Sequence, residues 1–461
     1  MKSIFIVSLV LALQAAVASA QTNLTILVSF GGTNGSEPQC DLYQGSDGNL
    51  YGTTYEGGNL NLNSGLGYGS VFKCTLGGQL TTLATFGVTN GAYPHGGVVQ
   101  GNDGNFYGTT LQGGTNGSDG TLYRVTTNGN LTPLVYFNGT NGALPYDQLV
   151  LGGNGVLYGT TGAGIPNTNA GTIFAYSTNT GLTTLAALDP NTEGETPWAG
   201  LFLGTNGLLY GTTSIDGSGG YGSVFSVTTN GTISPVAEFS LPNPHPANPY
   251  GGVVYGSDGL LYGTTTQGGS NFVNGTVYKL TSSGPVIVVN FNGTNGSGPM
   301  GRLCLANNNY LYGLTEQGGP LQDGNIFKIS PAGVLTTLVN FAVTNGFSPN
   351  AGLIQASDGN LYGVTRLGGQ NNKGVLFRLS GDFSVPPGPT IHLSLNPNNI
   401  ILFWTNNPAD YTLQFTTGLG TTNWSIAQPQ PTLVGNVYYY TNTISGNAGF
   451  YRLMQTAQQI Q

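Results

Sequence analysis

The sequence has few charged residues, few residues of the kinds that commonly carry out chemistry, and no long apolar run after its first twenty positions. Lys, Arg, Asp and Glu make up only 6% of the 461 residues, and there are three Cys and three His. Because nucleic-acid binding depends on clustered basic residues, this composition disfavours a nucleic-acid partner. No later segment approaches the roughly 18 uninterrupted apolar residues of a spanning helix, so we expect no membrane span.

The first twenty residues have the features of a secretory signal peptide. Lys2 precedes an apolar run at 4–13, and small residues end in Ala18-Ser19-Ala20. We therefore expect export, either to the cell surface or out of the cell, with residues 1–20 removed. The mature chain then has nine basic residues against eighteen acidic ones, a formal charge of about −9.

Glycine is abundant, with 77 residues, and it punctuates a repeat that recurs about every fifty residues. The repeat is marked by seven Tyr-Gly pairs, whose spacings are 56, 51, 52, 52, 50 and 50 residues. A period of this size is typical of one four-stranded blade of a β-propeller. The pairs begin at Tyr51, Tyr107, Tyr158, Tyr210, Tyr262, Tyr312 and Tyr362.

Each repeat resolves into four strands, A to D, separated by tight turns. In the second repeat these are expected at residues 97–100, 105–110, 120–126 and 131–137. Strand C carries an adjacent aliphatic and aromatic residue in every copy, Leu122-Tyr123 in this one, which places apolar side chains on both faces of the sheet. Each sheet is therefore expected to be covered on both faces by its neighbours.

The two ends of the repeat region complement each other. The region opens at 23–30 with a D strand that has no A, B or C before it, and its seventh copy stops after strand C at 380–381. The N-terminal strand is expected to complete the last blade, which closes the ring and removes exposed edges. We therefore predict an all-β, seven-bladed propeller over residues 21–381, in preference to an open solenoid.

The repeated motif also carries a family resemblance. The segments GxDGNLYGTTxxGG, GxVFKL, LTTLxxF and GTNGxxP resemble the GloVer-type tandem repeats of choice-of-anchor bacterial proteins, over roughly residues 23–381. The resemblance implies a bacterial envelope or secreted setting and implies no particular reaction.

A change of composition follows the repeats. Residues 382–390 form a Pro-rich linker, and 391–461 alternate as the strands of a small β-sandwich. The stretches 403–404, 411–414 and 450–453 are similar to the fibronectin-like end modules of bacterial secreted repeat proteins. No hydrophobic tail or basic stop follows Leu453, so the sequence does not indicate how this module would be anchored.

One variable position per repeat is the leading candidate for a ligand site. It follows the proline at the end of each D-to-A loop, and the seven side chains are expected to ring the mouth of the central channel. Aromatic and amide side chains there would suit a neutral glycan, or they could simply plug the channel. The ring consists of Gln39, His95, Tyr146, Trp198, Tyr250, Met300 and Asn350.

Two residues further along, three repeats carry a polar residue where the others carry Gly. Asp41, Gln148 and Arg302 are therefore candidate ligand contacts near the axis. The alternative for these three is an internal hydrogen-bond network around trapped water.

A catalytic site is weakly indicated. His95 and His245 are the histidines expected on the channel face, and His95 with Asp147 could form a general-base pair in a propeller lyase or hydrolase acting on a polysaccharide or cyclic ester. No motif fixes their spacing, so a non-enzymatic binding protein for an extracellular glycan or an envelope protein is preferred. A purely structural envelope module is a third possibility.

Metals and cofactors are not indicated. Cys and His are isolated, and the recurring GSDGN segment supplies one acidic side chain where a calcium loop needs several. Asp47 and its counterparts at 103, 258 and 358 are interpreted as turn formers. The odd number of cysteines leaves at least one unpaired, and Cys74 and Cys304 fall where other repeats carry aliphatic residues, so we expect both to be buried hydrophobes.

Overall fold

The computed structural model describes two regions of the chain. The repeat region is described over residues 22–115, 119–164, 170–240, 245–270 and 272–384, and the C-terminal region over 392–396, 399–405, 411–416, 425–429, 431–434, 437–443 and 450–455. The predicted signal peptide and residues 385–390 of the predicted linker lie outside these ranges. The helical elements described are two short 3₁₀ turns, η1 (Asn63–Gly65) and η2 (Val88–Asn90). Among the described residues no helix has the length and apolarity to cross a membrane.

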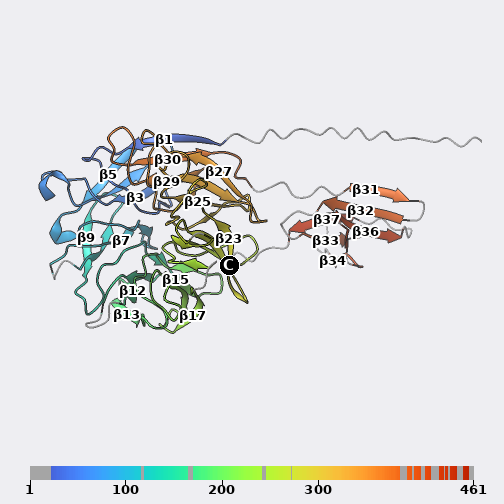
Figure 1. Ribbon diagram of the computed structural model, residues 1–461, viewed down its shortest axis with the longest axis horizontal. Helices are drawn as coiled ribbons and strands as arrows, with labels where there is room; N and C mark the ends of the chain where they lie inside the picture. Colours follow the sequence, from blue (N-terminus) through green and yellow to red (C-terminus); the bar gives the residue numbers. More distant parts are fainter. Residues whose placement is uncertain are drawn as a thin grey trace, which may run out of the picture.

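The repeat region forms seven four-stranded antiparallel sheets, which are the seven predicted blades. Figure 1 shows the chain passing around the ring from blue through green to orange. In blades 1 to 3 the strands are β2 (Tyr43–Gln44), β3 (Leu50–Thr54), β4 (Ser70–Cys74), β5 (Leu80–Thr85); β6 (Val99–Gln100), β7 (Phe106–Thr110), β8 (Thr121–Val125), β9 (Leu131–Tyr136); β10 (Val150–Leu151), β11 (Leu157–Thr161), β12 (Thr172–Ser177) and β13 (Gly181–Ala187).

Blades 4 to 6 repeat the same order, and blade 5 has an additional two-stranded sheet in its loops. The strands are β14 (Phe202–Leu203), β15 (Leu209–Thr213), β16 (Ser223–Val227), β17 (Ile233–Glu238); β19 (Val254–Tyr255), β20 (Leu261–Thr265), β22 (Thr276–Thr281), β23 (Gly284–Asn290); β24 (Cys304–Leu305), β25 (Leu311–Thr315), β26 (Asn325–Ile329), β27 (Leu335–Asn340), with β18 (Pro246–Ala247) pairing β21 (Gln267–Gly268).

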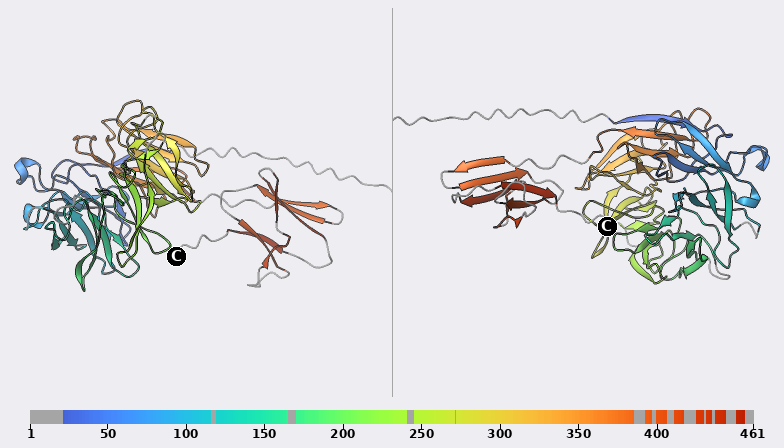
Figure 2. Two further views of the ribbon diagram at one scale, coloured as in Figure 1. Left: turned by 60° about the horizontal axis from the view of Figure 1, so that its bottom comes forward. Right: turned by 180° about the vertical axis from the view of Figure 1, so that it is seen from behind.

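The seventh blade joins the two ends of the repeat region, as predicted. It contains β28 (Ile354–Gln355), β29 (Leu361–Thr365) and β30 (Val375–Ser380), and its fourth strand is β1 (Asn23–Ser29). Figure 1 and the right-hand view of Figure 2 show blue β1 beside orange β30. The pairing of β1 with β30 has a register shift between Ile26 and Val28. In blades 1 to 6 the pairing of strand D with strand C shifts at the equivalent position. The N-terminal strand therefore reproduces the geometry of a covalently continuous D strand.

The core is divided into seven apolar clusters, one at each junction between neighbouring blades. Strand C supplies both sides, as the alternation predicted: Val71 packs toward blade 2, and the adjacent Phe72 packs toward blade 7. Each fully buried side chain of this size stabilises the fold by about 1.5–3 kcal/mol. Because the cluster between blades 7 and 1 is as complete as the others, the ring is closed.

The tyrosine of each Tyr-Gly pair holds the turn that precedes it. Its hydroxyl donates to the turn aspartate in blades 1, 2, 5 and 7, for example from Tyr51 to Asp47 at 2.9 Å. In blades 3, 4 and 6 the turn residue is Asn, whose amide donates to the tyrosine hydroxyl instead. These aspartates are thus turn formers, as interpreted from the sequence.

The three cysteines are free thiols. Cys40 and Cys74 are buried, and Cys304 is only partly buried. The expectation of a buried hydrophobe therefore fits Cys74 better than Cys304, which lies on the short innermost strand of blade 6.

The described residues of the C-terminal region form a four-stranded and a three-stranded sheet. Leu402 and Tyr440 from the first and Leu413 from the second belong to one buried cluster. That these sheets make a fibronectin-like sandwich stays a prediction. The strands are β31 (His392–Asn396), β32 (Asn399–Thr405), β36 (Val437–Thr443) and β35 (Thr432–Val434), then β34 (Ser425–Ile426), β33 (Tyr411–Thr416) and β37 (Phe450–Gln455).

Candidate functional site

The loops that lead into the first strand of each blade aim seven side chains at the channel. In every loop the residue before the proline has a positive φ, between 53° and 62°. In Tyr93 this strained conformation is held on both sides, because its N–H donates to the carbonyl of Tyr68 and its carbonyl accepts from Leu111. The loops are therefore rigid supports for the residue that follows each proline.

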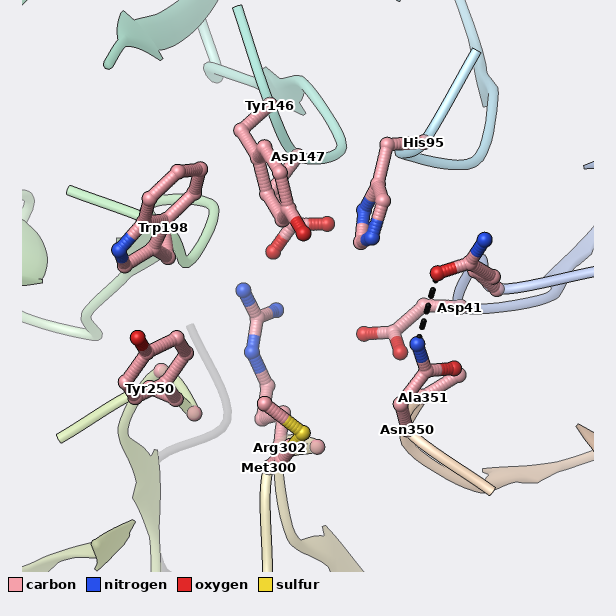
Figure 3. Close-up of a pocket in the computed structure, with 14 residues that line it drawn as sticks. Asp41, His95, Tyr146, Asp147, Trp198, Tyr250, Met300, Arg302, Asn350 and Ala351 are labelled. Carbon is pink, nitrogen blue, oxygen red and sulfur yellow. Dashed lines mark hydrogen bonds between the residues drawn. The ribbon is translucent and has the colours of Figure 1, made fainter. Parts of the chain in front are cut away.

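Those seven residues line a single pocket. The enclosed part of the cavity has about 50 Å³ of accessible space, which is less than a typical small-molecule site, and the figure rises to about 480 Å³ only when the open solvent at the mouth is included, so a ligand would lie mainly at the mouth. Figure 3 shows the side chains arranged around it. Of the sequence-predicted residues, the structure brings together Gln39, His95, Tyr146, Trp198, Tyr250, Met300, Asn350, Asp41, Arg302 and Asp147.

Two predicted residues do not line this pocket. His245 is exposed at the start of the β18 segment. The Gln148 amide donates to the carbonyl of Val98 at 2.6 Å, which ties blade 3 to blade 2. For Gln148 the internal hydrogen-bond alternative therefore describes the geometry.

One wall of the pocket is a continuous row of rings. His95 lies 3.7 Å from Tyr146, centroid to centroid, and Tyr146 meets Trp198 edge-on at 4.3 Å. The Trp198 and Tyr250 rings are parallel within 4°, with centroids 6.2 Å apart. All four side chains remain partly exposed. The aromatic residues thus form a wall and leave the mouth open.

The facing wall is made of two amide side chains and a methionine. Asn350 donates its amide hydrogen to Gln39 Oε1 at 2.9 Å, and Met300 lies beside them. The Asn350 Oδ1 atom is buried and has no hydrogen-bond partner among the described residues.

The floor is made of two carboxylates and one guanidinium. Arg302, from blade 6, reaches across the channel and donates to the carbonyl of Gly200 in blade 4 at 3.0 Å. Asp41 accepts from the Gly352 N–H at 2.6 Å, and Asp147 accepts from the N–H groups of Gln148 and Gly200. Figure 3 shows the Arg302 guanidinium pointing into the pocket, with Asp147 above it and Asp41 to its right. These three side chains line the inner part of the pocket.

Small residues elsewhere make room for this floor. A Cβ added to Gly252 would lie 3.1 Å from Arg302 Nε, and one added to Gly352 would lie 3.0 Å from Asp41 Oδ1. The Arg302 Nε–H is buried without a partner in the described part of the chain. A buried polar donor left unpaired costs about 1–3 kcal/mol, and more when the group is charged.

His95 and Asp147 both line the pocket, no hydrogen bond joins them among the described residues, and the general-base pair stays a prediction. Burial, with a smaller contribution from Arg366, lowers the pKa of His95 to about 3. This ring is neutral at neutral pH and stacks on Tyr146, while the Asp147 carboxylate is held by backbone N–H groups. His95 is therefore a poor proton acceptor and a good stacking surface.

The role of Asp147 in the floor was missed by the sequence analysis, which considered it only as a partner of His95. A usable signal was present, because the residue two after the loop proline is Cys40, Gly96, Ala199, Gly251, Gly301 or Ala351 in the other repeats. Asp147 is the one polar side chain at that position. A charged residue in a position otherwise reserved for small side chains marks a site near the axis.

Replacing Asp147 with Asn is expected to change how stability depends on pH. Burial and then the nearby Asp41 charge raise the pKa of Asp147 to about 6, against the opposing effect of Arg302. Because the folded state holds this proton more tightly than the unfolded chain, the carboxyl stabilises the fold below about pH 4, and that contribution is lost as pH rises through about 6. The loss amounts to about 3 kcal/mol.

Urea unfolding of the native protein and Asp147→Asn at about pH 3.5 and about pH 8 measures this difference. Between these two pH values, the free energy of unfolding of the native protein should fall by about 3 kcal/mol more than that of the variant. Asp103→Asn is a matched control of opposite sign, since hydrogen bonds from Asn105 and Tyr107 outweigh burial and lower the pKa of Asp103. Equal pH dependence in the native protein and Asp147→Asn would contradict the described floor.

Comparison with solved structures finds other proteins at low similarity. A gluconolactonase from Xanthomonas campestris is 12% identical, with 80% of this chain and 93% of that chain covered and a TM-score of 0.40. An α-L-arabinanase from Penicillium chrysogenum, solved with arabinobiose, is 15% identical over 62% and 92%, with a TM-score of 0.41. A putative 6-phosphogluconolactonase from Bacteroides uniformis is 16% identical over 71% and 96%, with a TM-score of 0.36. Likeness at this level carries no activity over to this chain.

The repeats themselves are matched by a family model. The Gloeobacter/Verrucomicrobia repeat model matches residues 15–215 and 198–386, most of the chain and all of the ring. No curated protein matches. The match confirms the resemblance seen in the repeated motif, and the chain belongs to the Gloeobacter/Verrucomicrobia repeat family.

Proposed function

We propose that this protein is an exported, non-enzymatic binding protein that holds a neutral sugar unit of an extracellular glycan in the pocket at the channel mouth. One observation carries the proposal: a continuous aromatic wall stands over a floor that offers both hydrogen-bond donors and acceptors. Sugars present apolar ring faces and hydroxyl edges, and this arrangement offers a partner for each.

The aromatic wall supports the apolar part of the contact. Trp198 and Tyr250 expose part of their parallel rings to the cavity, and the neutral His95 continues the surface through Tyr146. Stacking on such faces excludes water without requiring a charged ligand. Because the pKa of His95 is lowered to about 3, this surface stays neutral over the ordinary pH range.

The floor supports the polar part. Hydroxyl groups both donate and accept, so one ligand can donate to Asp41 or Asp147 and accept from the Arg302 guanidinium. The floor has two acidic side chains and one basic side chain, so its formal charge is net negative once Asp147 is ionised above about pH 6. Neutral glycans are therefore favoured over uronic or sialic acids, whose carboxylates would be repelled.

A glycan array probed with the mature protein tests this function. We expect signals from neutral saccharides and none from polygalacturonate or sialylated glycans. Signals confined to acidic glycans would contradict the proposed floor chemistry. An array without any signal would overturn glycan binding and leave the structural envelope module, or a protein partner, as the better account.

A hydrolase or lyase is the second candidate, because one observation favours it. A carboxyl with its pKa raised to about 6 beside a second carboxylate is an arrangement found in acid–base catalysis. Incubating the protein with the saccharides it binds and measuring released reducing ends distinguishes the two. Release that is abolished in Asp147→Asn would make this an enzyme, and unchanged saccharides would support a binding role.

The remaining regions fit the same setting. Residues 1–20 act as a secretory leader in this proposal, and 391–461 form a β-sandwich that follows the propeller at the cell surface or outside the cell. No metal or cofactor is part of the proposed site; within the described residues no group of three or more His, Cys, Asp or Glu is placed to hold a metal ion.

A further inference from the structure

We propose that the pocket is the inner end of a longer binding surface, which holds an extended neutral polysaccharide with its terminal unit in the pocket. This inference rests on the proposed function and adds the ligand class and the direction of the chain. The surface is an aromatic track that runs from the pocket across the loops of blades 1 and 2. It consists of Tyr250, Trp198, Tyr146, His95, Tyr55, Tyr93 and Tyr68.

The track is an unbroken series of ring contacts beyond the pocket. His95, the last ring of the pocket wall in this direction, meets Tyr55 edge-on at 6.4 Å between centroids. Tyr55 lies 4.9 Å from Tyr93, and Tyr93 meets Tyr68 edge-on at 5.6 Å. All three outer tyrosines are partly exposed, so each presents some of its surface to solvent.

An insertion in the first blade builds the outer part of the track. The first interval between Tyr-Gly pairs is 56 residues and the others are 50 to 52, and the additional length lies in the loop at 55–69, which contains η1. Within this loop Asn63 has a positive φ of 51° and donates its amide to the Tyr93 hydroxyl at 2.8 Å. The longer loop therefore positions a track tyrosine.

The positions equivalent to Tyr55 and Tyr93 carry no ring in the other blades, and the position equivalent to Tyr68 carries one only in blade 4, where it is Tyr221. The residues that correspond to Tyr93 are Glu37, Leu144, Thr196, Asn248, Gly298 and Ser348, and those that correspond to Tyr55 are Leu111, Gly162, Ser214, Thr266, Glu316 and Arg366.

At the junctions of blade 7 with blades 1 and 6, the side chains at these positions bond to one another. Arg366 forms an ion pair with Glu37 at 2.9 Å, and Ser348 donates to Glu316 at 3.1 Å. These loops pair polar groups and offer no stacking surface. The junction of blades 1 and 2 is therefore the aromatic exit from the pocket.

The small pocket gives the ligand its direction. Arg302 bridges blade 6 to the Gly200 carbonyl of blade 4, and the pocket has only about 50 Å³ of accessible space, so a polymer has no room to pass through it into the channel. A chain whose end sits in the pocket must leave across the loop face. A monosaccharide would use only the inner rings, so the outer tyrosines have a ligand-binding role only if the ligand is extended.

Affinity as a function of chain length tests the inference. Calorimetric titrations would use neutral gluco-, manno- and xylo-oligosaccharides of one to six units with the full mature protein. We expect the hexasaccharide of the preferred series to bind at least about tenfold more tightly than the monosaccharide. A Tyr55→Leu, Tyr93→Leu variant should lose about tenfold in hexasaccharide affinity and keep its monosaccharide affinity.

The substitutions are chosen so that the fold tolerates them. Leu111 and Leu144 occupy the corresponding positions in other repeats, and Leu144 has the same positive φ, 56°, as Tyr93 has at 58°. Tyr221→Leu is the matched control, because Tyr221 corresponds to Tyr68 but packs on Phe272 in blade 5, away from the track. Retained monosaccharide binding in the variant shows that the pocket is intact.

The possible results separate this inference from the proposed function. Equal affinity at all chain lengths, or length dependence that survives in the double variant, would overturn the track and leave the pocket in place. A similar loss in Tyr221→Leu would also overturn it. Absence of binding to every saccharide would overturn the proposed function itself.

Discussion

Deleting residues 22–31 is expected to unfold the propeller at ordinary temperatures. This segment provides the fourth strand of blade 7 and buries Val28 and Phe30 in the cluster between blades 7 and 1, with Leu24 and Ile26 packed on the next cluster. Large apolar side chains stabilise by about 1.5–3 kcal/mol each, and whole domains are stable by only about 5–15 kcal/mol. The deletion also exposes the edge of β30 to other chains.

Thermal and urea unfolding of the mature protein, with and without this segment, measure the effect. Phe30→Ala, which removes the ring that contacts Phe72 at 5.5 Å, should alone cost about 3–5 kcal/mol. Asn23→Ala, at the exposed start of the same strand, should stay within about 0.5 kcal/mol. If the deletion protein has the same midpoint of thermal unfolding as the mature protein, β1 does not close the ring.

The Trp198→Ala, Tyr250→Ala double variant is expected to lose glycan affinity by about a thousandfold. Truncating a central aromatic residue of a binding site costs about 2 kcal/mol or more, which is about thirtyfold in affinity for each ring. Both rings are partly exposed and lie after the loop prolines, so their loss leaves the blade clusters intact. Titration of the preferred saccharide into both proteins gives the measurement.

A matched pair in the same two blades serves as the control. Phe202 and Tyr255 also form a ring contact, at 5.5 Å, but they lie in strands β14 and β19 and do not line the pocket. Their replacement by Ala should lower stability and leave affinity nearly unchanged. Comparable losses of affinity in both double variants would mean that the pocket rings act through the fold and not through the ligand.

The architecture could be predicted because it depends on short sequence patterns that recur in every repeat. The Tyr-Gly period, the turn residues and the aliphatic-aromatic pair of strand C recur in every copy, so each repeat confirms the others. The closure of the ring could be predicted because the strand at 23–30 has no A, B or C strand before it and the seventh repeat has no strand D. The strand ends were predicted to within two residues in the second blade, since its turns contain Asn-Asp-Gly and Asn-Gly.

The site could be predicted only in part, because its outer half depends on an exception to the repeat. The post-proline ring followed from one position in a regular loop, and the structure brings all seven of its residues to one pocket. Tyr55 and Tyr93 belong to positions that are not aromatic in other copies, and the insertion at 55–69 has no counterpart to align with. The sequence indicates this insertion only through the 56-residue interval between the first two Tyr-Gly pairs. That interval gives the added length but not where the inserted residues lie in the fold.

The most direct test of the account is a crystal structure of the mature protein with a neutral hexasaccharide of the series that binds most tightly. The account predicts a terminal sugar against Trp198 and Tyr250 with its hydroxyls on Asp147 and Arg302, and further units crossing Tyr55 and Tyr93. Saccharide bound to the outer edges of the blades or to the C-terminal sheets, with the channel mouth unoccupied, would contradict it.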